Sequence, residues 1–178
     1  MLNSEECAYM NVAEFEQMEK DELITYELID GVVMMSPRPA LKHQLISANL
    51  HDAFSAIVKK HGCHMLSEIE LLLDEQYIVP DISIICDNVA NFIDSTRYKK
   101  PPLIVMEIVS PSSSGRDYML KRAKYQQLGI QEYWIVSPEE QCIWVIHYEQ
   151  GAEHHYCDGI VKSEVLPNLQ VDLEQIFM

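Results

Sequence analysis

Residues 103–109 read LIVMEIV, an uninterrupted apolar run with a single acidic residue, Glu107, near its centre. Residues 80–86 read PDISIIC, a second apolar run that is opened by Asp81. Short runs of this kind, rich in β-branched residues and bounded by turn residues, are typical of buried strands. A carboxylate in a buried strand loses hydration, which costs several kcal/mol unless a partner compensates. Two such carboxylates on adjacent strands could share a divalent cation, so the pattern predicts a metal site.

Each acid also has a structural interpretation, in which it pairs with a lysine or caps a loop. The metal interpretation is favoured because two isolated acids in apolar strands are hard to explain otherwise.

The segments around these two runs predict an α/β (α+β) fold, with a mixed central β-sheet flanked by helices. Residues 26–35 form a hairpin pattern that turns at Asp30-Gly31, a strong turn signal. Apolar residues at three- and four-residue spacing predict a long helix, and Gly62 follows its end. We expect helices over residues 12–20, 41–60 and 117–128, and strands over residues 26–35 (the hairpin), 68–73, 80–86, 103–109, 132–136 and 143–148.

The composition favours one globular domain over residues 1–178, with a core of about residues 15–150 and a C-terminal cap over residues 151–178. Hydrophobic residues make up 48% of the 178 residues. No apolar stretch approaches the roughly 20 residues of a membrane span. The acidic start of the chain, MLNSEE, lacks the basic and apolar regions of a secretory signal, so we expect a cytoplasmic protein and no membrane partner.

The cysteines and the charge set two further expectations. The five cysteines include no Cys-x-x-Cys pair, so we expect reduced thiols and no disulfide framework. Lys and Arg number 13 against 28 Asp and Glu, which gives a formal charge of −15. Nucleic-acid-binding proteins usually carry a basic surface. Any phosphate-binding surface must therefore be local, and the pairs at residues 59–60 and 99–100 are candidates for it.

A polar face on the helix after residues 103–109 supplies the remaining chemistry. Asp117, Lys121 and Tyr125 follow one another at four-residue spacing and share one side of the helix. Leu120 and Ala123 lie on another side, which we expect to face the core. A short loop from Glu107 can return this polar face to the acidic residues.

These groups fit a phosphodiester-cleaving design. Mg²⁺ (or Mn²⁺) prefers oxygen ligands, which Asp81, Glu107 and the backbone carbonyl of Val109 could supply. The metal would acidify a bound water and neutralise charge on the scissile phosphate. Lys121 would orient the attacking water or stabilise the developing charge.

An ordered series of motifs resembles the Uma-two family (domain of unknown function 820), a restriction-endonuclease-like branch of the PD-(D/E)xK nuclease superfamily. The resemblance covers about residues 15–150. The matching motifs are YELIDG at residues 26–31, Ser36-Pro37 with His43, Pro80-Asp81, EIVSPS at residues 107–112, Asp117-x-x-x-Lys121-x-x-x-Tyr125 and GIQEYWIV at residues 129–136.

This resemblance implies a restriction-endonuclease-like core, divalent-metal-dependent cleavage of DNA and a homodimer. By position, Asp81 and Glu107 match the acidic pair of the family and Lys121 matches a lysine that has migrated to the helix. Glu27 would match an extra acid near the N-terminus. Val109 stands where the superfamily usually has its lysine, so catalysis depends on Lys121 reaching the metal-bound water.

Two other functions remain open on the same fold. The charge of −15 favours a non-catalytic binding or assembly module. Metal-dependent hydrolysis of a small phosphate-containing substrate would need no basic DNA-binding surface. Among single residues, His43 could contact a phosphate or satisfy a loop, and the loop interpretation is favoured. His154, His155 and Cys157 are interpreted as part of a solvated turn, because their spacing matches no standard zinc template.

Overall fold

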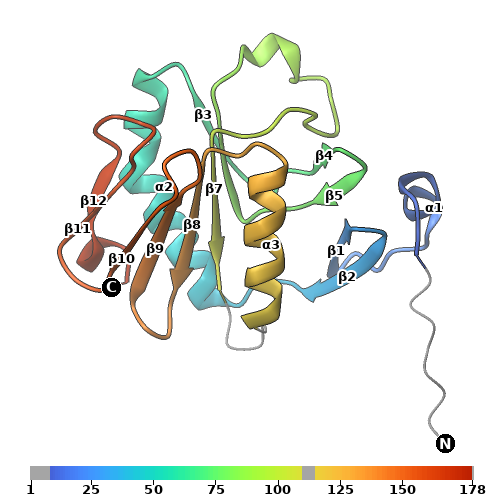
Figure 1. Cartoon of the computed structure of the whole chain (residues 1–178), viewed down its shortest axis with the longest axis horizontal. Coiled ribbons are helices and arrows are strands. Elements are labelled where there is room, and N and C mark those ends of the chain that lie inside the picture. The colour runs from blue at the N-terminus through green and yellow to red at the C-terminus, as the bar shows by residue number, and fades with distance from the viewer. Residues whose placement is uncertain (1–8, 110–114, 178) are drawn as a thin grey trace, which may run out of the picture.

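The computed structural model describes residues 9–109 and 115–177, which form a mixed α/β fold (Figure 1). The helices are α1 (Val12–Gln17), α2 (Leu41–Lys60) and α3 (Gly115–Gln127), with 3-10 turns η1 (Val89–Asn91) and η2 (Leu173–Gln175). The strands are β1 (Ile24–Ile29), β2 (Val32–Pro37), β3 (His64–Ser67), β4 (Leu71–Leu73), β5 (Gln76–Ile78), β6 (Ile82–Ile85), β7 (Ile104–Ile108), β8 (Glu132–Ser137), β9 (Cys142–His147), β10 (Ala152–Tyr156), β11 (Ile160–Lys162) and β12 (Gln170–Asp172).

The central sheet has six strands in the order β10-β9-β8-β7-β6-β3. Strands β7 and β8 are parallel, and α3 forms the connection between them, as parallel neighbours require. The other pairs are antiparallel, so the sheet is mixed as the sequence predicts. Strands β6 and β7 are neighbours, with Ile82 opposite Met106. The acidic runs singled out in the sequence therefore lie side by side.

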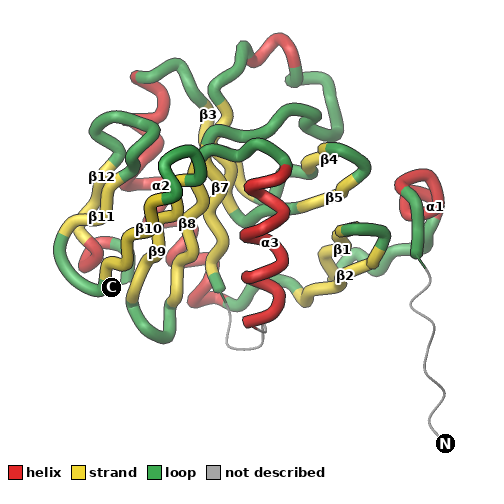
Figure 2. The backbone as a smooth tube through the Cα atoms, viewed as in Figure 1, coloured by secondary structure: helices red, strands yellow, loops and turns green. Residues whose placement is uncertain are grey.

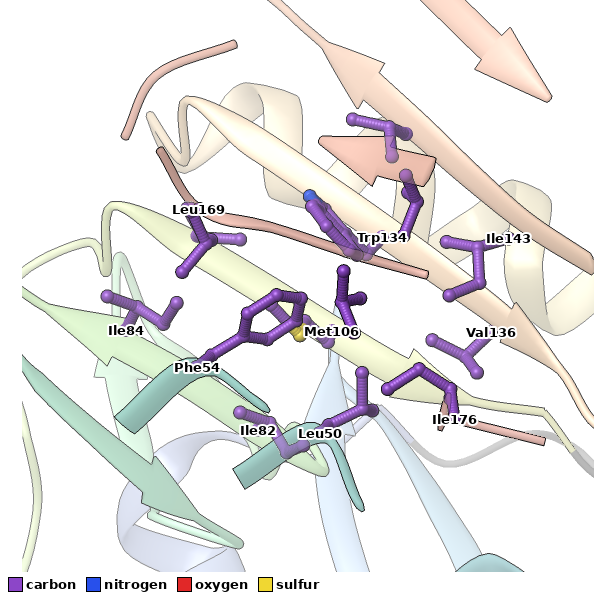
Figure 3. Close-up of a cluster of buried hydrophobic side chains, with 14 of the residues drawn as sticks. Leu50, Phe54, Ile82, Ile84, Met106, Trp134, Val136, Ile143, Leu169 and Ile176 are labelled. Carbon is purple, nitrogen blue, oxygen red and sulfur yellow. The ribbon is translucent and has the colours of Figure 1, made fainter. Parts of the chain in front are cut away.

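Helices α2 and α3 pack on opposite faces of the central sheet, because successive strand residues point to opposite faces. Met106 and Trp134 pack with Leu50 and Phe54 of α2 in the largest core cluster (Figure 3). Val105 and Tyr133, their chain neighbours, instead pack with Tyr125 of α3. Glu107, two residues after Val105, points to the α3 face.

A second sheet, with strand order β2-β1-β5-β4, lies beside α3 and carries Glu27 (Figure 1). Its hairpin turns at Asp30 and Gly31, which have φ angles of 50° and 76°. This turn confirms the predicted hairpin, although β2 continues through Ser36 and Pro37, two residues beyond the predicted end. Ile29 packs with Tyr125, so the sheet is joined to α3 through apolar contact.

Residues after 150 contribute to the central sheet and to its core. β10 forms the edge strand of the six-stranded sheet. β11, β12 and η2 then cover the α2 side, where Val161, Leu169 and Ile176 join the largest core cluster. The largest core cluster therefore includes residues close to the end of the described chain.

Several boundaries agree closely with the sequence patterns. α2 covers Leu41–Lys60 as predicted, and Gly62 with φ of 72° follows its end. β7 and β8 form where the apolar runs lie. The segment after β6 is irregular apart from η1 (Figure 2).

Other boundaries differ from the predictions. The alternating run at residues 68–73 yields only the short β4, and β3 precedes it where no strand was expected. Glu68 interrupts the pattern with a φ of 49°, which breaks the extended conformation between the two strands. Asp81 lies one residue before β6 and not within it. The predicted N-terminal helix is shorter, ending at Gln17.

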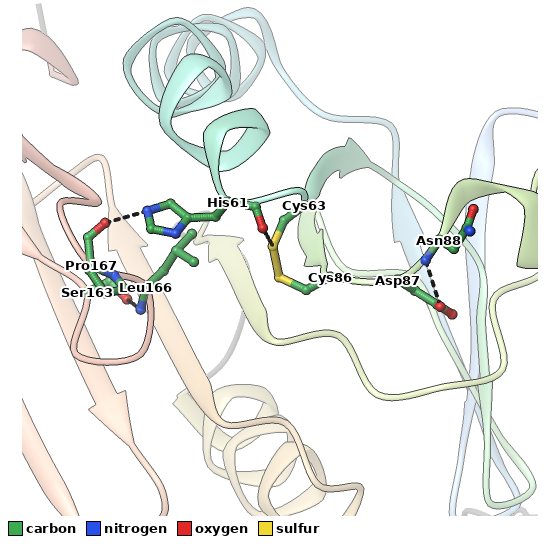
Figure 4. The surroundings of a disulfide bond; sticks show 8 residues. All are labelled: His61, Cys63, Cys86, Asp87, Asn88, Ser163, Leu166 and Pro167. Atoms are coloured by element: carbon green, nitrogen blue, oxygen red, sulfur yellow. Dashed lines mark hydrogen bonds between the residues drawn. A yellow bond between two sulfur atoms is a disulfide. The ribbon is translucent and has the colours of Figure 1, made fainter.

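The prediction of reduced cysteines is wrong for four of the five. Cys63 is bonded to Cys86 (Figure 4), and Cys142 is bonded to Cys157. Both pairs continue an antiparallel register by one residue, beyond His64↔Ile85 and Tyr156↔Ile143. Sequence spacing could not reveal these pairs, because strand register brings the thiols together. Cys7 lies outside the described residues.

Within the described ranges, no helix combines the length and the apolar character needed to cross a lipid bilayer.

Candidate active site

A pocket of about 580 Å³ lies between the start of α2, strand β2 and the adjoining ends of β6 and β7. All the site residues proposed from the sequence contribute to its lining: Glu27, Asp81, Glu107, Val109 and Lys121. The structure thus brings together residues from both sheets and from α3. The pocket also includes Arg38, Lys42 and His43 from the segment that enters α2.

Glu107 is the acidic residue at the base of this arrangement and is 8% exposed. Its Oε1 accepts hydrogen bonds from Lys121 Nζ at 3.0 Å and from Tyr125 OH at 2.5 Å. Burial raises the pKa of Glu107 above its usual range, and the nearby Asp81 and Glu27 act in the same direction against the opposing charge of Lys121. A neighbouring cation would therefore stabilise the ionised carboxylate.

Lys121 links the two glutamates. Its Nζ lies 3.0 Å from Oε2 of Glu27 and 3.0 Å from Oε1 of Glu107. Burial alone would lower the pKa of Lys121, but the charges of Glu107 and Glu27 outweigh this effect and raise the pKa. The side chain is therefore a permanent ammonium in the pocket, and it comes from α3 and not from β7.

Glu27 reaches the site from β1 and is 3% exposed. While Oε2 faces Lys121, Oε1 accepts a hydrogen bond from the backbone N–H of Val79 at 2.9 Å. Both oxygens therefore have partners within the protein. Glu27 is held in place to orient Lys121, and this geometry favours a positioning role over a metal-binding role.

Asp81 joins the site from the other side. Its Oδ2 accepts a hydrogen bond from the N–H of Ile108 at 2.7 Å, which fixes the carboxylate next to the end of β7. The same oxygen lies 3.0 Å from Nε2 of His43. The hydrogen bonds therefore engage Oδ2 of Asp81 and Oε1 of Glu107, and the second oxygen of each carboxylate is the candidate metal ligand.

His43 is a site residue whose role the sequence did not reveal, whereas Tyr125 belongs to the predicted polar face of α3. His43 was interpreted as a loop residue, but its ring contacts Asp81 and lines the pocket. Burial would lower the pKa of His43, but the hydrogen bond and the charge of Asp81 outweigh this effect, so the pKa is raised. His43 lies two residues after the start of a predicted helix, and nothing in the sequence near it indicated an acidic partner. The sequence therefore gave no signal of its pairing with Asp81.

The packing of α3 agrees with the expectation only in part. Leu120 and Ala123, expected in the core, are exposed, whereas Lys124 and Tyr125 are buried. Lys124 is bonded to Asp30 in the β1–β2 turn at 2.6 Å. The predicted polar face, with Lys121 and Tyr125, does meet the acidic residues, whereas the predicted apolar side lies outward. The side chain of Asp117 lies outside the described residues.

A buried glutamate away from the pocket was also missed. Glu132 is fully buried on β8, where it accepts hydrogen bonds from Nε1 of Trp134 at 2.7 Å and from the N–H of Glu164 at 2.7 Å. Its role is to attach the C-terminal segment to the sheet.

Comparison with known proteins agrees with this geometry. The model of the Uma2 (Uma-two) family, described as "putative restriction endonuclease", matches residues 12–174. A crystal structure from Anabaena variabilis ATCC 29413, described as a putative nuclease of the DUF820 group, has a TM-score of 0.82 and 22% sequence identity. The alignment covers 94% of this chain and 97% of the other.

No curated protein matches the chain. The structural match supports the fold, and the family match spans nearly all of the described residues, including every residue of the pocket named above. This chain therefore belongs to the Uma2 family, whose members are described as putative restriction endonucleases.

Proposed function

We propose that this protein is a divalent-metal-dependent nuclease that hydrolyses phosphodiester bonds in DNA. The observation that carries the proposal is the meeting of Asp81 and Glu107, from neighbouring strands, with the helix-borne ammonium of Lys121 in one pocket. The family description supports the same reaction class.

The donor groups fit Mg²⁺ or Mn²⁺. Asp81, Glu107 and the carbonyl of Val109 offer hard oxygen ligands, which these ions prefer. The negative charges of Glu27, Asp81 and Glu107 exceed the positive charge of Lys121, so a further cation suits the pocket. When bound, such an ion acidifies a water molecule and neutralises charge on a phosphate.

The residues of the chain would divide the remaining work. Lys121 keeps its proton and can donate hydrogen bonds to the attacking water or to a phosphate oxygen as negative charge develops. Glu27 orients Lys121 through the 3.0 Å ion pair. Tyr125 fixes Oε1 of Glu107 and so directs its other oxygen toward the pocket.

DNA is the proposed substrate because two basic side chains, Arg38 and Lys42, line the pocket. Two acidic side chains, Glu68 and Glu139, line it as well, and Lys42 lies 3.6 Å from Glu139. The first turn of α2 also lies there, and its N-cap residue, Ala40, makes no side-chain capping hydrogen bond. Free N–H groups at the start of a long helix favour phosphate.

We also propose a homodimer, because cleavage of both strands of a duplex at one place needs two sites. Sedimentation of the purified protein would give twice the chain mass of 20.6 kDa if this is correct.

The proposal is tested by the nicking of supercoiled plasmid with Mg²⁺ or Mn²⁺. We expect Asp81→Asn and Lys121→Met each to lower the rate about 100-fold or more, the scale seen when a charge-stabilising group is removed. Asp87→Asn is a matched control, because Asp81 lies just before β6 and Asp87 lies just after it. Asp87 pairs with Lys100 and does not line the pocket. Lys124→Met is the second control, because this buried lysine of α3 bonds Asp30.

Nicking that persists in Asp81→Asn and Lys121→Met would overturn the nuclease assignment. A folded protein that neither binds Mn²⁺ by calorimetry nor cleaves DNA would favour a non-catalytic binding module. Cleavage of nucleotides but not plasmid would instead indicate a small phosphate-containing substrate.

A further inference from the structure

A second group of metal-ligating side chains lies on the β9–β10 hairpin, at the opposite edge of the central sheet from β3. Cys142 begins β9, and Cys157 directly follows β10. Because Tyr156 pairs with Ile143, the register puts Cys157 opposite Cys142. His155 precedes Cys157 by two residues, so both side chains lie on the same face of β10.

The three ligand atoms are close together. Nε2 of His155 lies 3.3 Å from Sγ of Cys157. One ligand atom from each of Cys142, His155 and Cys157 lies within 4.8 Å of the others, and within the described ranges no other such group of three occurs. A tetrahedral zinc ion with bonds of about 2.3 Å to sulfur and 2.0–2.1 Å to nitrogen requires sulfur and nitrogen about 3.5 Å apart.

The histidine is already oriented for this task. Its ring stacks on Trp144, with ring centres 4.2 Å apart and an angle of 11° between the planes. Trp144 is opposite His155 in the strand register. Restriction of the ring lowers the entropy that metal binding would otherwise cost, because the ligand needs no reorientation.

The structure has Cys142 and Cys157 joined as a disulfide, which leaves no thiolate for a metal. We propose that reduction of this bond opens a Zn²⁺ site formed by Cys142, His155 and Cys157, and that oxidation closes it. His155 and Cys157 are exposed on the edge strand, so solvent can supply a fourth ligand.

The chemistry balances with a dithiol as the reductant. The dithiol transfers two electrons and two protons, the Sγ–Sγ bond breaks, two thiols form, and the dithiol becomes a disulfide. Zinc then displaces the two thiol protons, which pass to solvent, and binds the thiolates and the neutral imidazole.

The second disulfide provides a natural comparison. Cys63 and Cys86 are also opposite one another across antiparallel strands, but the nearby histidines are engaged elsewhere. The ring of His61 bonds the carbonyl of Pro167, and the ring of His64 lies edge-on to Phe92. This pair should therefore undergo the same thiol chemistry without binding a metal.

The test uses full-length protein carrying Cys7→Ser and Asp81→Asn, which removes the remaining thiol and weakens the pocket site. Co²⁺ serves as the probe, because its bonds to thiolates give a charge-transfer absorption band that carboxylate ligands do not give. After reduction with a dithiol and removal of the reductant under argon, we expect one equivalent of Co²⁺ to produce the band and Zn²⁺ to abolish it. The oxidised protein should give no band.

Variants then assign the ligands. We expect Cys142→Ser to abolish the band and His155→Ala, a change at an exposed side chain, to weaken Co²⁺ binding at least about tenfold. Cys63→Ser with Cys86→Ser should leave the band unchanged. A reduced protein without the band, or a band of equal strength and affinity in His155→Ala, would overturn the proposal.

Discussion

Glu107 is the residue around which the charges of the pocket are arranged. Lys121 and Tyr125 both donate to its Oε1, and Asp81 is fixed beside it through the N–H of Ile108. The sequence revealed Asp81 and Glu107 because each is an acid in an apolar run. It revealed Lys121 through its place in the ordered series of motifs. It could not reveal the His43–Asp81 contact, since that contact depends on how the start of α2 is positioned against the sheet.

Replacing Tyr125 by Phe tests the hydrogen bond that orients Glu107. The acceptor is a buried carboxylate, so we expect Tyr125→Phe to lower the free energy of unfolding by about 1.5–3 kcal/mol. Tyr148→Phe is the matched control, since Tyr148 OH donates to the neutral carbonyl of Arg122 at 2.7 Å. Its expected cost is about 1 kcal/mol. Urea denaturation measures both values, and equal losses would contradict the prediction.

The protonation of Glu107 predicts a pH dependence. Burial raises its pKa from 4.5 to about 7 in the folded protein. A raised pKa means that the folded state binds the proton more tightly, so the stabilising contribution is complete below about 4.5 and is lost as pH rises through about 7. Metal-free protein should therefore lose stability over this window relative to Glu107→Gln.

Denaturation curves at several pH values, with and without Mg²⁺, measure this effect. Added Mg²⁺ should restore stability to the unsubstituted protein most strongly above pH 7, because proton and metal compete for the same carboxylate. Parallel pH profiles for the protein and Glu107→Gln would refute the assignment.

At the scale of elements, α2 could be predicted almost to the residue, whereas α3 was predicted in part. Its polar face was correctly directed to the acidic residues, but its predicted apolar side is exposed. The boundaries of α2 follow from its apolar spacing and from Gly62 at its end. The orientation of α3 follows from long-range charges, since Lys121 meets Glu27 and Glu107 while Lys124 meets Asp30. Hydrophobic pattern alone assigned its core-facing side to Leu120 and Ala123, because no local signal records those partners.

The short strands β3, β4 and β5 were difficult for a related reason. They contain three or four residues each, and their boundaries depend on pairing with distant strands. The positive φ of Glu68, Asp74 and Glu75 redirects the chain between them.

The two ends of α2 give a prediction about DNA binding. Lys42 lies at the pocket, whereas Lys60 is about 27 Å away along the helix axis, at 1.5 Å per residue. We expect Lys42→Ala to reduce the slope of log affinity against log salt by about 1, as loss of one phosphate contact does. Lys60→Ala should leave the slope unchanged. Binding to catalytically inactive protein, followed by fluorescence anisotropy, distinguishes the two; equal effects would exclude the pocket as the DNA site.

For the whole molecule, the layered fold and the mixed sheet could be predicted, but the covalent links could not. The cysteines of each pair are 23 and 15 residues apart, and their strands are recognisable only as strands, not as partners. The formal charge of −15 was informative in a limited way. It led to the prediction that any basic surface is local, and the basic residues that line the pocket are Arg38, Lys42 and Lys121, not the two lysine pairs.

The Cys63–Cys86 bond predicts an effect on global stability. It closes a loop with a sequence separation of 23, for which loss of unfolded-state freedom corresponds to about 3 kcal/mol. Under oxidising conditions, Cys63→Ala with Cys86→Ala should lower the free energy of unfolding by about this amount. Cys7→Ala is the control. If the paired variant unfolds at the same urea concentration as the oxidised protein, the bond does not contribute to the fold.

The division of the pocket between sheet and helix has a consequence for the newly made protein. Asp81 and Glu107 belong to hydrogen-bonded strands, but the ammonium of Lys121 arrives only when α3 has packed against Tyr133 and Ile29. A chain in which α3 has not packed would therefore hold the two acids without the amine. Under the proposed function, such a chain lacks a group that the reaction requires.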